Sequence, residues 1–103
     1  MIPYLSIIIP AYNEQESIQW VVENTIHDIP KYFSDWEIVV VDDGSSDETG
    51  QILDRLSATH PQLRVIHQSN KGYSQAMLTG FSASTKDFIT YMPADGQFLV
   101  QDM

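Results

Sequence analysis

The chain has 103 residues, of which 43% are hydrophobic and 11% aromatic, and 14 acids against five Lys and Arg residues give it a formal net charge of −9. This length suits one globular domain with a single core, and the composition excludes a disordered chain. The acidic balance argues against nucleic acid as a partner, because binding to phosphates needs a cationic footprint.

The first predicted elements are a strand and a helix. Residues 5–10 form a dense apolar run, which predicts a buried strand that ends at Pro10. Asn13, with Glu16 three residues later, has the pattern of an N-terminal capping box. The apolar residues that follow recur at helical spacing and predict an amphipathic helix that ends at Pro30; they are Ile18, Val21, Val22, Thr25, Ile26 and Ile29.

The second pair of elements surrounds two adjacent acids. Residues 37–41 contain an apolar run without alternation, which is typical of a strand covered on both faces in a parallel sheet. Asp42 and Asp43 follow it directly and lead into a Gly/Ser turn. Ser45 with Glu48 repeats the capping-box pattern. A second helix is predicted by the apolar residues Ile52, Leu53 and Leu56.

The rest of the chain continues the alternation. Residues 64–67 predict a third strand, residues 73–81 a third helix, and residues 88–92 a fourth strand that ends at the turn 93–97. Such alternation predicts an α/β fold with a mostly parallel, open sheet and helices on both faces. Because the chain stops just past a strand end, we expect residues 1–103 to be a single domain that is the N-terminal part of a longer one.

Polar side chains follow three of the predicted strands. Tyr12, Asn13 and Glu14 follow the first, Asp42 and Asp43 the second, and Asp95 and Gln97 the fourth. The carboxyl ends of parallel strands share one edge of the sheet, where open α/β proteins bind their ligands. These residues therefore predict a ligand site. For Asp42 and Asp43 alone, a solvated turn with helix-capping acids is the plainer interpretation.

Four segments, in order, carry a family resemblance: SIIIPAYNE at residues 6–14, VVDDGSSDET at 40–49, NKGYSQAMLTGF at 70–81 and ADGQ at 94–97. Together they resemble the N-terminal half of a family 2 glycosyltransferase with the GT-A fold, and within that family the dolichyl- and polyprenyl-phosphate sugar transferases. The resemblance implies a Rossmann-like nucleotide-binding unit and a hexosyltransferase activity that uses a UDP- or GDP-sugar.

The resemblance also implies a site. The residues that match its nucleotide-sugar positions are Pro10, Ala11, Tyr12, Glu14, Asp42, Asp43, Lys71, Ala94 and Asp95. Asp95 and Gln97 match the end of the family's metal motif and imply Mg²⁺ or Mn²⁺, which take such oxygen ligands. Where that motif begins with an acid, this chain has Pro93. The absence of this carboxylate is expected to weaken metal affinity, to shift the metal's position or to alter contact with the donor ribose.

The mechanism implied by the resemblance is inverting transfer of the sugar to an acceptor such as a polyprenyl phosphate or a glycan. The catalytic base is expected beyond residue 103, so no catalytic residue is assigned here, and the 103 residues are expected to bind a nucleotide without transferring sugar. The absence of cysteine fits a cytoplasmic protein. We found no apolar stretch long enough to span a bilayer, and we expect the full-length protein at the inner face of the membrane.

Other classes of protein are weighed against this hypothesis. Pro93 and the missing second half leave open a non-catalytic, truncated or degenerate GT-A module used for binding or assembly. A phosphoacceptor receiver domain is disfavoured, because its acid pair would follow the first strand.

His27, His60 and His67 share no metal-ligand spacing and are predicted to be surface or strand-end residues. An unfinished sheet would leave an edge strand that could pair with a second copy.

Overall fold

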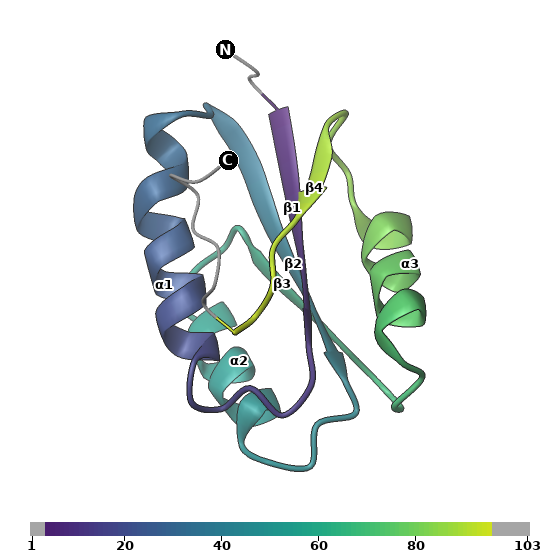
Figure 1. Ribbon diagram of the computed structural model, residues 1–103. Coiled ribbons are helices and arrows are strands. Elements are labelled where there is room, and N and C mark those ends of the chain that lie inside the picture. The colour runs from purple at the N-terminus through teal and green to yellow at the C-terminus, as the bar shows by residue number, and fades with distance from the viewer. Residues whose placement is uncertain (1–3, 96–103) are drawn as a thin grey trace.

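The computed structural model describes residues 4–95 (Figure 1). Four strands alternate with three α-helices, and a short 3₁₀ helix, η1, follows the first of these. Their bounds are β1 Tyr4–Ala11, α1 Ile18–Asp28, η1 Ile29–Lys31, β2 Asp35–Asp43, α2 Thr49–Ser57, β3 Leu63–Gln68, α3 Tyr73–Ala83 and β4 Ile89–Tyr91. The predicted alternation of strands and helices is confirmed.

The four strands form one parallel sheet in the order β3-β2-β1-β4. β1 lies in the interior and pairs with β2 along its whole length, from Tyr4 opposite Asp35 to Ala11 opposite Asp42. On its other side it pairs with β4, with Ser6 opposite Ile89. The open parallel sheet predicted from the sequence is therefore confirmed.

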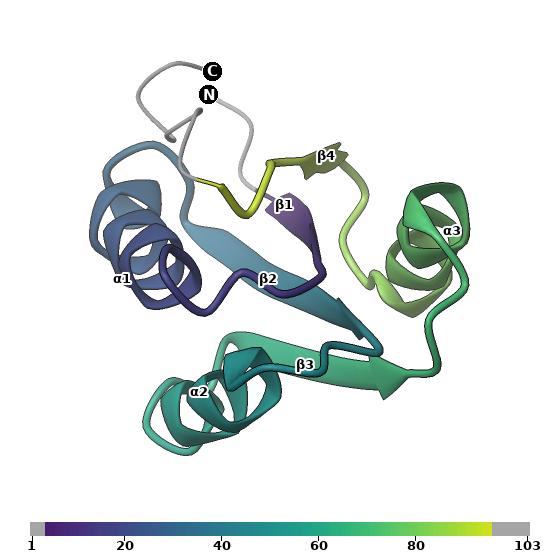
Figure 2. The same ribbon diagram turned by 60° about the horizontal axis from the view of Figure 1, so that its bottom comes forward.

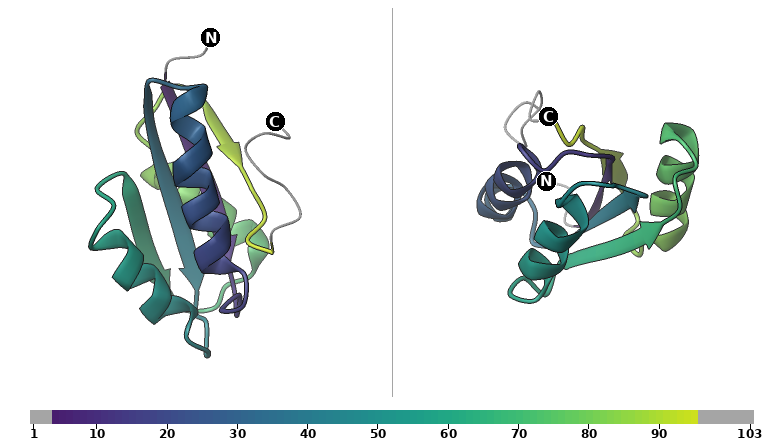
Figure 3. Two further views of the ribbon diagram at one scale, coloured as in Figure 1. Left: turned by 90° about the vertical axis from the view of Figure 1, so that its left-hand side faces the viewer. Right: turned by 90° about the horizontal axis from the view of Figure 1, so that it is seen from below.

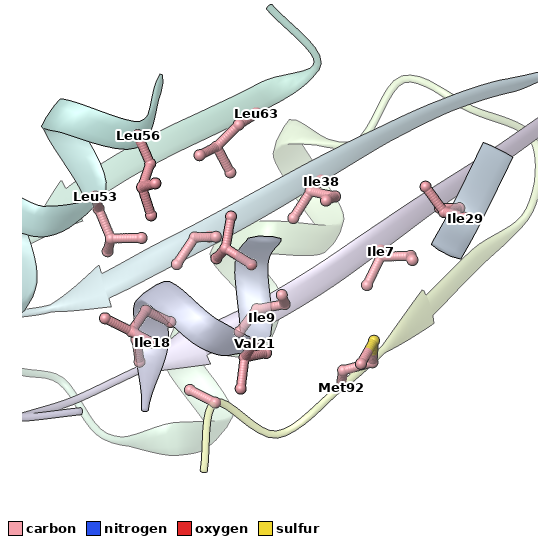
Figure 4. Close-up of a cluster of buried hydrophobic side chains, with 14 of the residues drawn as sticks. Ile7, Ile9, Ile18, Val21, Ile29, Ile38, Leu53, Leu56, Leu63 and Met92 are labelled. Carbon is pink, nitrogen blue, oxygen red and sulfur yellow. The ribbon is translucent and has the colours of Figure 1, made fainter. Parts of the chain in front are cut away.

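Helices cover both faces of the sheet, as predicted. Seen from below, α1 and α2 lie on one side and α3 lies on the other (Figures 2 and 3). The larger core lies under α1 and α2, where Ile7, Ile9 and Ile38 meet Val21 and Leu53 (Figure 4). The smaller core lies under α3 and includes Val39, Val41 and Ala76.

The unalternating run in β2 follows from this arrangement. Ile38 and Val40 pack toward α1 and α2, whereas Val39 and Val41 pack toward α3, and all four are fully buried. Burial of each such side chain contributes about 1.5–3 kcal/mol. A strand with two buried faces needs apolar residues at every position, and this is why the pattern predicted a parallel sheet.

The predicted helix caps are wrong. α1 is preceded by Ser17 and α2 by Glu48, and neither residue caps its helix with a side-chain hydrogen bond. Asn13 and Ser45 instead bond across to each other's loops. β4 is also shorter than predicted, since Phe88 and Met92 lie outside it.

Within residues 4–95, no helix is long and apolar enough to cross a membrane. Gln97, a predicted metal ligand, lies outside the described residues. In the described part of the chain β4 pairs only with β1, and pairing of its other edge with a second copy stays a prediction.

Candidate functional site

A cavity of about 320 Å³ opens at the carboxyl end of the sheet, at the lower end of the strands in Figure 1. Its walls come from the loop after β1, the end of β2, the start of α3 and the turn after β4. The residues that line it are Pro10, Ala11, Tyr12, Glu14, Asp43, Asn70, Gly72, Tyr73, Ala76, Pro93, Ala94 and Asp95. Segments that are far apart in the sequence thus meet where the strand ends predicted a site.

Most of the residues predicted to bind a nucleotide sugar line this cavity. They are Pro10, Ala11, Tyr12, Glu14, Asp43, Ala94 and Asp95. Asp42 and Lys71 are not among the lining residues. Sequence analysis missed the wall contributed by Asn70, Gly72, Tyr73 and Ala76, although all four lie within the quoted segment 70–81 and the first two flank Lys71 directly.

Asp43 is held by donors from two neighbouring elements. Its Oδ1 accepts hydrogen bonds from Gln68 Nε2 at 2.8 Å and from the N–H of Lys71 at 2.9 Å, and its Oδ2 accepts one from the N–H of Gly72 at 3.0 Å. Burial alone would raise the pKa of Asp43, but these hydrogen bonds and the charge of Lys71 hold it below its ordinary value. Asp43 is therefore an ionised acceptor in the cavity wall.

Lys71 contributes its backbone to this arrangement. Its N–H fixes Asp43, and its ammonium helps to keep that carboxylate charged. The Asn70 side chain also donates to the backbone carbonyl of Asp43 at 3.1 Å. The segment before α3 is thus tied to the end of β2 through both the main chain and the side chain of Asp43.

Asp42 points to the opposite side of the sheet, because successive side chains of a strand alternate. Its Oδ2 lies 2.8 Å from His67 Nδ1, and its Oδ1 accepts the N–H of Ser45 at 3.1 Å.

The other ring nitrogen of His67 lies 2.7 Å from Asp54 Oδ1 in α2. Hydrogen bonds to Asp54 and Asp42 raise the pKa of His67. His67 lies one residue before the end of β3, as a strand-end histidine should, and its ring joins α2 to the sheet.

The loop after β1 is fastened to the loop after β2. The N–H of Asn13 donates to Ser45 Oγ at 3.0 Å, and Asn13 Oδ1 accepts the N–H of Ser46 at 2.8 Å. The N–H of Glu14 donates to Thr49 Oγ1 at 2.8 Å. These bonds place Tyr12 and Glu14 on the cavity wall.

The cavity contains a group of acids. Burial raises the pKa of Glu14, and the negative charges of Asp95 and Asp47 raise it further, against the lowering effect of a hydrogen bond from Ser17. Ser17 Oγ also donates to the carbonyl of Ala94 at 2.7 Å, which fixes the turn that carries Asp95. Among residues 4–95, the lining includes three carboxylates and no Lys or Arg.

The carboxylate oxygens and the negative charge of the cavity wall suit a divalent cation. Asp95 offers a carboxylate oxygen, and an acidic wall would repel a pyrophosphate that came without a cation. Within residues 4–95, no three His, Cys, Asp or Glu side chains are arranged to hold a metal by themselves. Mg²⁺ commonly takes one or two carboxylates and completes its shell with water and substrate phosphates, so the residues present fit such an ion.

Comparison with known proteins identifies the family. The model of glycosyl transferase family 2 matches residues 6–102. The uncharacterized glycosyltransferase EpsJ of Bacillus subtilis is 36% identical over 92% of this chain and 27% of its own length. The undecaprenyl-phosphate 4-deoxy-4-formamido-L-arabinose transferase of Edwardsiella ictaluri is 37% identical over 93% of this chain and 30% of its own length. The chain thus spans less than a third of either relative.

Solved structures agree in fold. The mannosyltransferase PcManGT of Pyrobaculum calidifontis, in complex with GDP-Man and Mn²⁺, superposes with a TM-score of 0.81 at 29% identity, over 92% of this chain and 28% of its own. S. aureus TarS 1-349, in complex with UDP-GlcNAc, gives a TM-score of 0.77 at 28% identity, over 88% of this chain and 26% of its own. The arrangement of strands and helices is that of GT-A glycosyltransferases, and the chain belongs to glycosyl transferase family 2.

Proposed function

We propose that this chain forms the donor- and metal-binding part of an inverting glycosyltransferase, and that residues 1–103 are the N-terminal part of a longer GT-A domain. The donor is a UDP- or GDP-sugar, and the acceptor is a polyprenyl phosphate or a glycan. The observation that carries this proposal is the cavity itself, in which ionised Asp43 and the acid Asp95 line one site built from strand ends.

Each wall has a proposed role. Asp43 accepts a hydrogen bond from an N–H of the nucleotide base, and Tyr12 and Tyr73 provide aromatic surface beside it. Pro10, Ala11 and Ala94 provide close apolar contact. Asp42 acts indirectly, because its carboxylate holds the Gly/Ser loop through the N–H of Ser45. Lys71 acts through its backbone and its charge on Asp43.

Asp95, together with Gln97, would hold Mg²⁺ or Mn²⁺, which when bound neutralises the pyrophosphate and helps the nucleoside diphosphate to leave. Glu14, whose pKa is raised by burial and by Asp95, adds negative charge to the same wall. No residue of this chain is assigned as the base that activates the acceptor. We therefore expect the 103 residues to bind the donor nucleotide without transferring sugar.

The names of relatives support the acceptor class. One of them is named an undecaprenyl-phosphate 4-deoxy-4-formamido-L-arabinose transferase, which supports a polyprenyl phosphate as the acceptor. If the whole protein uses such an acceptor, it works in the cytoplasm at the inner face of the membrane. Two of the matching solved structures hold GDP-Man and UDP-GlcNAc, which supports a nucleotide-diphosphate sugar without choosing between the two bases.

Isothermal titration with UDP and with GDP, each with and without Mn²⁺, tests the proposal. We expect Mn²⁺-dependent binding of one nucleotide, and its loss in Asp95→Ala. Asp87→Ala, which removes an exposed acid from the loop before β4, is the matched control and should bind like the wild type. If a folded wild-type chain binds neither nucleotide, the donor site is absent, and a non-catalytic module is the better interpretation.

A further inference from the structure

Two side chains connect the Asp43 carboxylate to helix α3. Gln68 Nε2 donates to Asp43 Oδ1 at 2.8 Å, and Thr79 Oγ1 donates to Gln68 Oε1 at 2.7 Å. Asp43 and Gln68 are register partners at the ends of β2 and β3, so both side chains leave the sheet on the same face, the one that α3 covers. The chain of bonds therefore runs from α3 through β3 to β2.

The charge of Asp43 determines which group donates and which accepts in each of these hydrogen bonds. An ionised carboxylate only accepts hydrogen bonds, so Gln68 must turn its amide nitrogen toward Asp43 and its carbonyl oxygen toward Thr79. The hydroxyl of Thr79 then has to donate to that carbonyl. It is also 3.0 Å from the carbonyl of Gln75, but the bond to Gln68 is the shorter of the two. Asp43 thus selects one of the two amide orientations, and Thr79 supplies the donor that this orientation needs.

The arrangement leaves one side of the carboxylate open to a further donor. Oδ1 already accepts from Gln68 and from the N–H of Lys71, whereas Oδ2 accepts only from the N–H of Gly72 among the described residues. A carboxylate oxygen can accept two hydrogen bonds. Asp43 lines the cavity, but Gln68 and Thr79 do not.

We propose that Gln68 and Thr79 are positioning residues, which fix the Asp43 carboxylate in the orientation that accepts an N–H of the nucleotide base; this inference rests on the proposed function of the cavity. Neither residue touches the ligand. Gln68 fills Oδ1 with a donor, and Thr79 holds the Gln68 amide for that bond, so that Oδ2 is the oxygen presented to the base. A role limited to docking α3 on the sheet would change the stability of the chain but not the affinity of the folded protein.

Gln68→Glu is the most informative variant, because it replaces the donor to Asp43 with a second carboxylate. At about pH 8 the two charges repel, and we expect nucleotide affinity to fall about 10- to 100-fold, the range for losing a hydrogen bond to a charged group. At about pH 6 the pair takes up a shared proton, which restores a donor, and affinity should recover. The effect is read as the ratio of variant to wild-type affinity at each pH, because the terminal phosphate of UDP and GDP also titrates at about pH 6.

Thr79 supplies a second, independent pair of variants. Thr79→Val removes the hydroxyl and should weaken binding, whereas Thr79→Ser retains it and should bind like the wild type. Ser84→Ala is the matched control, since the Ser84 hydroxyl also bonds a carbonyl one turn back in α3, that of Gly80, but takes no part in the chain to Asp43.

The measurements are isothermal titration of the 103-residue chain with UDP and GDP in the presence of Mn²⁺, and an NMR titration of the Asp43 carboxyl carbon without nucleotide. In the NMR titration we expect Gln68→Ala to raise the pKa of Asp43.

If the wild type binds nucleotide and Gln68→Glu binds equally well at all pH values, the positioning role is wrong while the proposed function stands. If no nucleotide binds but the NMR shift occurs, the proposed function fails and the link from Gln68 to Asp43 remains. An unchanged Asp43 titration would overturn that link.

Discussion

Asn13 and Ser46 are 33 positions apart, yet Asn13 Oδ1 accepts the N–H of Ser46 at 2.8 Å. Asn13 adopts a left-handed conformation, with φ of 52°, and its own N–H donates to Ser45 Oγ. Asn13 therefore connects the loop after β1 to the loop after β2 through both its main chain and its side chain. Tyr12 and Glu14, on either side of it, reach the cavity wall as a result.

Substitution of Asn13 should separate its conformational role from its bonding role. Asn13→Gly tolerates the positive φ but loses the acceptor, so we expect nucleotide affinity to fall about tenfold, as for one lost hydrogen bond. Asn13→Ala also strains the backbone and should lose a further 1 kcal/mol or so of stability, about the cost of a non-glycine residue in this region. Titration calorimetry and urea unfolding measure the two effects. Wild-type affinity in Asn13→Gly would contradict the assigned role.

Glu37 should make the stability of the fold depend on acid. Burial alone would raise its pKa, but hydrogen bonds from Ser6, the Thr85 N–H and Arg64 lower it to about 2 from 4.5. Because the folded-state pKa is the lower one, this stabilisation is present above pH 4.5 and is lost as the pH falls toward about 2.

Glu37→Gln tests this assignment. The amide cannot serve all the donors that meet Glu37, so we expect a loss of about 2 kcal/mol at neutral pH, typical of hydrogen bonds to a charged group. The difference from the wild type should shrink as the pH approaches 2, and urea unfolding at several pH values measures it. Glu23→Gln, on α1, is the control. A difference that stays constant with pH would show that the Glu37 charge contributes nothing.

His67 should act in the opposite sense. Hydrogen bonds to Asp54 and Asp42 raise the pKa of His67 above the ordinary 6.5. The stabilisation of the folded state by His67 is therefore fully present below pH 6.5 and is lost as the pH rises through the folded-state pKa. The ring is nearly half exposed, and solvent screening keeps the effect below about 1 kcal/mol. His67→Gln should remove this pH dependence from the unfolding free energy, whereas His60→Gln should retain it.

Gly44 and Gly72 form a matched pair for the turns beside the cavity. Both have positive φ, 72° and 95°, but a Cβ on Gly44 would lie 2.5 Å from the backbone nitrogen of Asn70, whereas a Cβ on Gly72 would meet nothing within 4 Å. Gly44→Ala should therefore destabilise the protein about 1–3 kcal/mol more than Gly72→Ala, as overpacking does. Thermal and urea unfolding of the two variants compare them, and equal losses would mean that Asn70 moves aside at little cost.

The sequence predicted the sheet well, because a strand buried on both faces requires an unbroken apolar run such as the one that precedes Asp42. It also predicted the edge of the sheet at which the cavity lies. It did not show that Asp42 and Asp43 serve opposite faces, although strand alternation contains that information.

The local patterns at the helix starts were misleading for a physical reason. Asn13 and Ser45 have the composition of helix caps, but each finds a better partner in a loop more than 30 positions away. A pattern of neighbouring residues cannot reveal such a partner. The wall formed by Gly72 and Tyr73 was missed in the same way, since it depends on how α3 docks against β1 and β2.

The position of β4 has a consequence for how the chain folds. The strand pairs with β1, and next to this pairing the N–H of Lys86 bonds Ser6 Oγ across 80 positions of sequence. β1 also pairs with β2 and is synthesised before β4, so its second edge has no partner until β4 has been synthesised. Loop closure over such a distance slows folding and leaves that edge exposed to other chains in the meantime. During synthesis we therefore expect an interval in which the unpaired edge of β1 can pair with the strands of other chains.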